Sequence, residues 1–130
     1  MGQRSPGSRT ARPLTPAMFH ILLALAAGER HGYAIMREVD ALTGGAQRLG
    51  PGSLYGSIKR MLADGLIEEC GERPDPAADD ERRRYYRLTD LGRRAAGTEA
   101  RRLEVLVMVA RGRRLLGQPA PATGARRGAR

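Results

Sequence analysis

The stretch GPGSLYGSIKRMLADGLIEE, Gly50–Glu69, predicts a short helix followed at once by a strand. Its apolar residues recur at the spacing of one helix face, namely Leu54, Ile58, Met61 and Leu62. The opposite face is small and cationic, with Ser53, Gly56, Lys59, Arg60 and Ala63. Gly65 ends the helix, and Leu66-Ile67 begins an extended segment. A core can hold such a helix on one side while the other side enters a DNA groove.

Two further helices are predicted upstream of this stretch. Thr15-Pro16 is a favourable helix start, and Gly28 ends that helix near Ala27. Its apolar face comprises Met18, Ile21, Leu22 and Leu25. His31-Gly32 opens the second helix and Gly44-Gly45 closes it. The buried stripe predicted for this second helix is Ile35, Val39 and Leu42.

The hydrophobic period changes after Gly65, which predicts two strands joined by a loop. Leu66–Cys70 is the first strand and Arg84–Leu88 the second, with one of Tyr85 and Tyr86 in the core and the other exposed. The intervening loop, residues 71–83, is rich in Pro, Asp and Ala and carries an acidic tip made of Asp75, Asp79, Asp80 and Glu81. Two strands directly after a helix-turn-helix make a winged helix, so we expect a mainly α (α+β) fold.

A long fourth helix is predicted from Thr89, its capping residue, to about Leu116. The segment Leu103–Val109 is apolar almost all round, although the outer side of a helix on a small domain should be polar. This segment therefore predicts a homodimer. The residues expected in the dimer interface are Leu103, Leu106, Val107, Val109 and Ala110.

Four short motifs together resemble the PadR-type transcriptional regulators over about Leu14–Arg94. They are His31–Ile35, Gly52–Tyr55, Arg60–Ile67, and Arg83–Thr89 followed by Gly92. The resemblance implies a winged helix-turn-helix dimer whose third helix enters the major groove. It also implies that Tyr33 and Tyr55 lie near DNA phosphates, and that a small aromatic or hydrophobic effector binds near the dimer interface. The chain departs from the family at Gly56, where proline is usual, and in its long acidic wing.

The candidate DNA-binding residues lie on the predicted third helix and the wing. Arg60 is the expected base reader because its fork can bond guanine bidentately, and Lys59 is expected to contact phosphate. Ser53 and Ser57 serve either as solvent-exposed polar residues or as phosphate contacts, and Gly56 lets the backbone approach DNA. Wing contacts are expected from the run Arg82–Arg84 (Arg82, Arg83 and Arg84), unless these arginines only balance the acidic loop.

Charge divides the chain into four predicted segments. The 130 residues hold 23 Lys and Arg against 14 Asp and Glu, a net charge of +9. Three arginines and no acid lie in each tail, so the middle, with 17 basic and 14 acidic residues, has a net charge of only +3. We expect a disordered basic arm over 1–13, a DNA-binding domain over 14–88, a dimerisation helix over 89–117 and a disordered basic tail over 118–130.

Other site types have little support in the sequence. Cys70, the only cysteine, is expected to be a small buried strand residue and not a redox sensor. His20 and His31 are too few for a metal site, and we expect no catalytic residues and no cofactor. No apolar run reaches the roughly 18 residues that span a membrane. We therefore expect a cytoplasmic protein without a membrane partner.

The leading hypothesis is a sequence-specific, dimeric transcriptional regulator that represses from a pseudo-palindromic operator. One alternative is a nonspecific architectural nucleic-acid-binding protein driven by the basic tails. Another is a winged helix that serves only as a protein-interaction module. Removing the two tails distinguishes the first two, because a domain that reads sequence keeps its selectivity without them.

Overall fold

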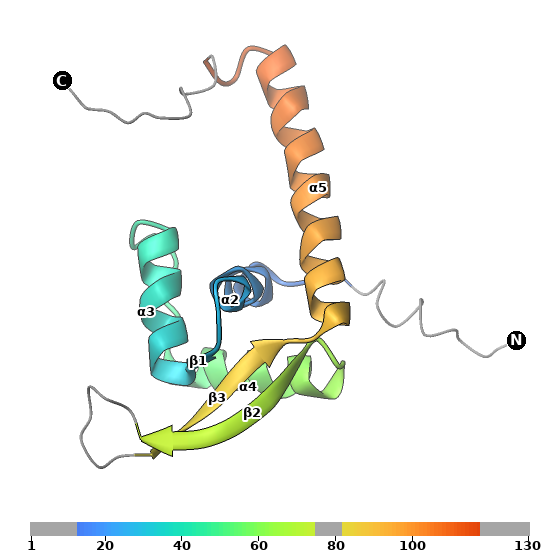
Figure 1. Ribbon diagram of the computed structural model, residues 1–130. Helices are drawn as coiled ribbons and strands as arrows, with labels where there is room; N and C mark the ends of the chain where they lie inside the picture. The colour runs from blue at the N-terminus through green and yellow to red at the C-terminus, as the bar shows by residue number, and fades with distance from the viewer. Residues whose placement is uncertain (1–12, 75–81, 118–130) are drawn as a thin grey trace, which may run out of the picture. The chain divides into compact units, whose positions relative to one another are not determined.

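The computed structural model describes residues 13–74 and 82–117. Its elements in chain order are α2 (Pro16–Ala26), β1 (Arg30–His31), α3 (Gly32–Leu42), α4 (Pro51–Ala63), β2 (Ile67–Pro74), β3 (Arg82–Leu88) and α5 (Asp90–Gly112) (Figure 1). Helices thus predominate over one small sheet, which confirms the predicted winged helix-turn-helix fold with a long C-terminal helix. The two predicted tails and the acidic wing tip lie outside the described residues. By its internal contacts the chain divides into two units, Met1–Glu99 and Ala100–Arg130.

The starts of α2 and α3 follow from their capping residues. The Thr15 side chain accepts a hydrogen bond from the Met18 backbone amide at 3.1 Å, and Pro16 occupies the first helical position. At α3, Nδ1 of His31 accepts a hydrogen bond from the Ala34 amide, also at 3.1 Å. Both predicted helix starts are confirmed.

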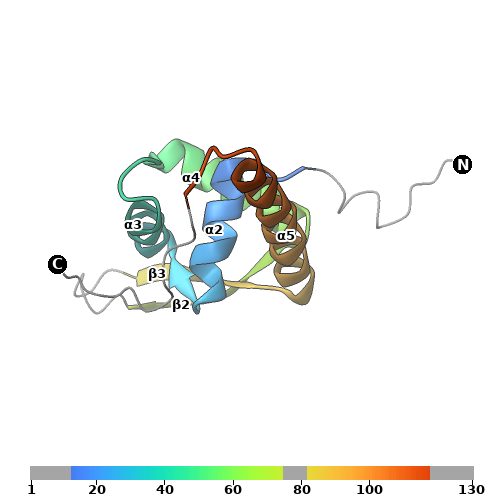
Figure 2. The ribbon, with the colours of Figure 1, turned by 90° about the horizontal axis from the view of Figure 1, so that it is seen from above.

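The core of the winged unit is formed where α2 packs against α3, α4 and β3 (Figure 2). Its largest fully buried side chains are Met18, Ile21, Leu22, Ile35, Val39, Leu54, Met61 and Ile67. Two predicted core residues are wrong, because Leu42 and Leu62 are 49% and 37% exposed. Each lies at or beside the C-terminal end of its helix, where the chain turns away and the described residues leave the side chain partly exposed.

The sheet is antiparallel with the order β1-β3-β2. The two-residue strand β1 was not predicted; it pairs Arg30 with Tyr86 and His31 with Tyr85. The prediction of a loop over residues 71–83 is wrong at both ends, because β2 continues to Pro74 and β3 begins at Arg82. Opposite charges face one another across these strands, as at Glu72 and Arg84, and such pairs stabilise exposed strands that lack an apolar pattern.

A close backbone approach joins the end of α4 to the start of α5. Gly65 has a φ of +76° and ends α4, while the Leu66 amide bonds to the Met61 carbonyl at 2.9 Å. The Thr89 hydroxyl donates to the Gly65 carbonyl at 2.6 Å and accepts from the Gly92 amide at 3.0 Å. Thr89 therefore caps α5 as predicted and also fixes its start to the turn before β2.

Helix α5 ends earlier than predicted. It stops at Gly112 and not near Leu116, because Arg114 adopts a left-handed φ of 64°. The Leu115 amide then bonds to the Ala110 carbonyl at 2.9 Å, which closes the helix end as a Schellman-type turn.

Candidate nucleic-acid interface

The exposed face of α4 carries most of the predicted DNA-binding residues of this helix. Leu54, Ile58 and Met61 are buried, so the opposite side of the helix is presented to solvent. Ser53, Gly56 and Lys59 are exposed on it, while Ser57 is half-buried. A side chain added at Gly56 would meet no atom within 4 Å, so this surface is open at its middle. The face can therefore approach a flat or convex partner without obstruction.

The two cations of α4 differ in their surroundings. Arg60 Nε lies 3.7 Å from Oδ2 of Asp64, one helical turn further along, and the Arg60 side chain is 38% exposed. Lys59 is exposed and has no carboxylate within 4.0 Å among residues 13–74 and 82–117. Lys59 thus offers an uncompensated positive charge, whereas Arg60 is already engaged within the helix end.

Tyr55 lies across the first turn of α3. A Cβ placed on Gly32 would come within 2.3 Å of the Tyr55 hydroxyl oxygen and 2.8 Å of its ring carbon Cζ. A side chain at position 32 would displace this ring, which is 47% exposed. In its present position the hydroxyl of Tyr55 lies at the N-terminus of α3, where backbone amides and the helix dipole favour an anion.

The Tyr33 ring lies within reach of cations from two elements. The guanidinium carbon of Arg37, one turn further along α3, lies 5.3 Å from the centre of the Tyr33 ring. That of Arg83, on β3, lies 5.8 Å from the same centre. Both distances are within the range of cation–π attraction. Arg37 was missed by the sequence reasoning, although its position four residues after the exposed Tyr33 could have drawn attention to it.

The other wing arginines are bound to acids on β2. Arg84 Nε lies 3.7 Å from carboxylate oxygens of both Glu69 and Glu72. The Arg87 side chain donates to Glu68 at 2.7 Å, a bond that raises the pKa of Arg87. Arg82 pairs with Pro74 in the ladder, and nothing further is described for its side chain. Of the two predicted wing contacts whose side chains are described, Arg83 lies near α3 and Arg84 does not.

A second network supports the base of the wing. Arg73 donates to Glu29 at 2.7 Å, and this bond lowers the pKa of the Glu29 carboxyl below its ordinary 4.5. The same guanidinium stacks 4.0 Å above the centre of the Tyr85 ring, which meets the His31 ring edge-on at 5.2 Å. Tyr85 is half-buried and Tyr86 is only 5% exposed, so the expected core residue of this pair is Tyr86.

The thiol of Cys70 lies at the edge of this network. Arg73 approaches its sulfur at 3.6 Å, and the side chain is partly buried. Burial is the largest influence on this group and raises the pKa of the Cys70 thiol above its ordinary 9.0. A high thiol pKa keeps the group protonated and unreactive near neutrality. This environment favours the structural role predicted for Cys70.

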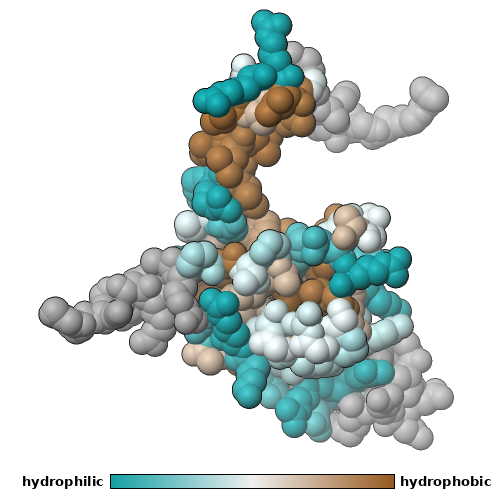
Figure 3. All heavy atoms as spheres, turned by 180° about the vertical axis from the view of Figure 1, so that it is seen from behind, coloured by the Kyte–Doolittle hydropathy of each residue, from teal (hydrophilic) through white to brown (hydrophobic). Residues whose placement is uncertain are grey.

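The second unit carries the residues predicted for a dimer interface. Leu106, Val107 and Val109 are between 42% and 50% exposed, while Leu103 and Ala110 are half-buried. Figure 3 shows hydrophobic side chains covering the second half of α5 on the side in view. Val105 and Met108 are exposed as well, so the apolar surface extends around the helix.

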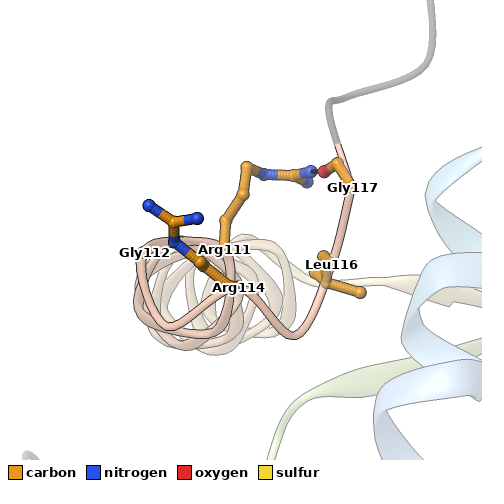
Figure 4. Close-up of a pocket in the computed structure, with 5 residues that line it drawn as sticks. All are labelled: Arg111, Gly112, Arg114, Leu116 and Gly117. Carbon is orange, nitrogen blue, oxygen red and sulfur yellow. Dashed lines mark hydrogen bonds between the residues drawn. The ribbon is translucent and has the colours of Figure 1, made fainter.

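A hollow lies at the C-terminal end of α5 (Figure 4). Its lining consists of Arg111, Gly112, Arg114, Leu116 and Gly117, and the Arg111 side chain donates to the Gly117 carbonyl. Leu116 is the single apolar side chain in this lining. The hollow therefore does not suit the hydrophobic effector that the family resemblance implies.

Residues 13–74 and 82–117 hold no group of three or more His, Cys, Asp or Glu side chains placed to bind a metal ion. Within the same residues, no helix is both long enough and apolar enough to cross a membrane.

Comparison with known proteins gives a family match over most of the winged unit. The family model described as "Transcriptional regulator PadR-like family" matches residues 21–98. Transcriptional regulator Rv3488 of Mycobacterium tuberculosis is 37% identical over 87 residues, which cover 67% of this chain and 75% of that protein. An uncharacterized 37.1 kDa protein in transposon TN4556 of Streptomyces fradiae is 39% identical over 84 residues. That match covers 65% of this chain but spans only 22% of the Streptomyces protein.

The fold also matches solved structures. The crystal structure of Bacillus subtilis PadR in complex with operator DNA superposes with a TM-score of 0.58 at 20% identity. The match covers 88% of this chain and 55% of that one. At 20% identity this structural similarity is evidence for a shared fold alone.

Proposed function

Because the chain belongs to the PadR-like family of transcriptional regulators, we propose that it binds double-stranded DNA sequence-specifically, as a homodimer, and represses transcription. One observation carries the proposal: α4 is fixed by a buried apolar stripe and leaves Ser53, Gly56 and Lys59 exposed on the other side. A recognition helix needs this combination of one face buried in the core and an opposite face that is open to DNA. The operator-bound structure of the B. subtilis relative supports the same use of the fold.

We assign base reading in the major groove to α4. Arg60 has the fork that bonds guanine bidentately, a contact worth about 1–3 kcal/mol of discrimination. To make it, Arg60 must exchange its contact with Asp64, 3.7 Å away, for the base. Gly56 lets the backbone approach the bases, and Ser53, Ser57 and Lys59 contact phosphates.

The second group of proposed contacts flanks α4. Tyr33 and Tyr55 meet the DNA backbone from the start of α3 and from α4. Arg82, Arg83 and Arg84 are the proposed wing contacts, and Arg83 is favoured because its guanidinium lies 5.8 Å from the centre of the Tyr33 ring, beside the start of α3. Contacts of this kind supply affinity that falls as the salt concentration rises.

We propose that the second half of α5 joins two copies of the chain. Leu103, Leu106 and Ala110 are spaced by three and four residues and form one stripe, and Val107 and Val109 widen it. Dimerisation would present two α4 helices about one DNA turn apart, roughly 34 Å, to a pseudo-palindromic site. A small hydrophobic effector bound near this interface would regulate the protein by changing the angle between the two winged units.

The test combines selection of bound sequences from a random duplex library with sedimentation of the full chain. We expect a pseudo-palindromic motif and a dimer, and a reporter gene placed behind that motif should be transcribed less when the protein is present. A chain lacking residues 1–12 and 118–130 should keep the motif with a smaller salt dependence. Sequence-blind binding that vanishes with the tails would support a nonspecific nucleic-acid-binding protein instead.

A further inference from the structure

Arg37 has an unusual position among the arginines of the winged unit. Six of them have a carboxylate oxygen within 4.0 Å, namely Arg30, Arg48, Arg60, Arg73, Arg84 and Arg87. Arg37 has none among residues 13–74 and 82–117, and its described contact is the face of the Tyr33 ring. Its charge is therefore not neutralised by the part of the chain that the structure describes.

A second guanidinium is brought to the same ring from another element. Arg83 of β3 lies 5.8 Å from the Tyr33 ring centre, compared with 5.3 Å for Arg37. The Tyr33 ring thus lies where α3 and the wing strand β3 meet, and the charge of Arg37 is presented at this junction. Tyr33 is 46% exposed, so the cluster is open to such a ligand.

The neighbouring groups favour a phosphodiester as this anion. Tyr33 lies in the first turn of α3, and the Tyr55 hydroxyl lies close to Gly32 in the same turn. Guanidinium groups, tyrosine hydroxyls and helix N-termini are the groups that bind DNA phosphates. A planar guanidinium stacked on a ring is also pre-oriented for two parallel bonds to phosphate oxygens.

We propose that Arg37, stacked on Tyr33, binds one backbone phosphate of DNA at the junction between α3 and the wing. This inference rests on the proposed function and adds a contact residue to it. This phosphate site lies between α3 and β3. A phosphate bound there would fix both the wing and the helix-turn-helix, including α4, at one position along the duplex. Arg37 thus contributes to register and affinity and does not discriminate between bases.

The test compares Arg37→Ala with the full wild-type chain on the selected duplex and on a random duplex. We expect about tenfold weaker binding to both duplexes, with an unchanged ratio between them. The slope of log affinity against log salt should become shallower by about 0.9 for each bound protomer. Arg37→Lys should keep the wild-type slope, because lysine retains the charge. Arg94→Ala is the matched control, since Arg94 is an exposed arginine of α5 that likewise has no carboxylate within 4.0 Å among the described residues.

Neutral methylphosphonate linkages locate the contact on the duplex. At one position in each half-site, the substitution should weaken the wild-type chain but not Arg37→Ala. An Arg37→Ala variant with the wild-type slope and the wild-type response to every methylphosphonate would overturn this inference alone. A wild-type chain that selects no sequence would overturn the proposed function and this inference with it.

Discussion

Gly92→Ala should destabilise the winged unit strongly, although alanine is the better helix former. A Cβ at position 92 would lie 1.9 Å from the Leu66 carbonyl oxygen and 2.9 Å from its carbon. The start of α5 would have to move by about 1.5 Å or more to reach ordinary contact, because the backbone atoms of Leu66 cannot rotate away as a side chain can. That movement strains two hydrogen bonds, from Thr89 to Leu66 at 3.1 Å and from Gly92 to Thr89 at 3.0 Å.

The magnitude follows from these contacts. Overpacking costs about 1–3 kcal/mol, and each weakened hydrogen bond adds about 0.5–1.5 kcal/mol. The gain in helix propensity, about 1 kcal/mol, offsets part of this. We expect a net loss of about 3 kcal/mol in the free energy of unfolding. For a domain of this size, such a loss lowers the melting temperature by about 10–20 °C.

Gly97→Ala supplies the matched control in the same helix. A Cβ at Gly97 meets nothing within 4 Å, so this variant should be more stable by about 0.5–1 kcal/mol. Thermal and urea unfolding would be followed by circular dichroism at one fixed protein concentration, because the midpoint of a dimer depends on concentration. If Gly92→Ala unfolds within about 0.5 kcal/mol of the wild type, the inferred rigidity of the α5 start is refuted.

Three further outcomes are expected. Lys59→Ala should reduce the slope of log affinity for DNA against log salt by about 1. The unfolding midpoint should stay unchanged, since Lys59 has no described ion pair. An unchanged slope would count against Lys59 as a phosphate contact. Glu29→Gln should lower stability near pH 7, and the difference from the wild type should shrink as the pH falls below 4.5. The bond from Arg73 lowers the pKa of Glu29, so its contribution is fully present above 4.5 and is lost as the pH falls through the folded-state pKa. Cys70 should react with a thiol reagent more slowly than free cysteine at pH 8, because burial raises its pKa; equal rates would contradict this.

The helices could be predicted because their signals are local. Thr15, His31 and Gly65 act on backbone groups within a few residues, and the apolar spacing of α2 and α4 follows from the helix period alone. The predicted burial of a side chain was wrong where it depends on neighbouring elements of the tertiary structure. Leu62 lies at the edge of its helix's apolar face, and whether it is buried depends on what lies above it.

The candidate site was predictable only in its α4 part. Ser53, Gly56 and Lys59 share a face by helix geometry, so the sequence was enough to group them. The cluster of Tyr33, Arg37 and Arg83 joins α3 to a strand some 50 residues later along the chain, and no sequence spacing encodes that contact. Similarly, β1 has two residues and therefore no alternation from which it could be recognised.

His31 leaves no linker between the sheet and α3. The same residue pairs with Tyr85 in the ladder, packs its ring against that tyrosine and caps the helix that follows. Opening the first turn of α3 therefore means opening the β1–β3 pairing as well. In hydrogen-exchange terms, the amides of both should become exchangeable in a single cooperative event. The pairing edge of β3 and the start of α3 should therefore open and close together.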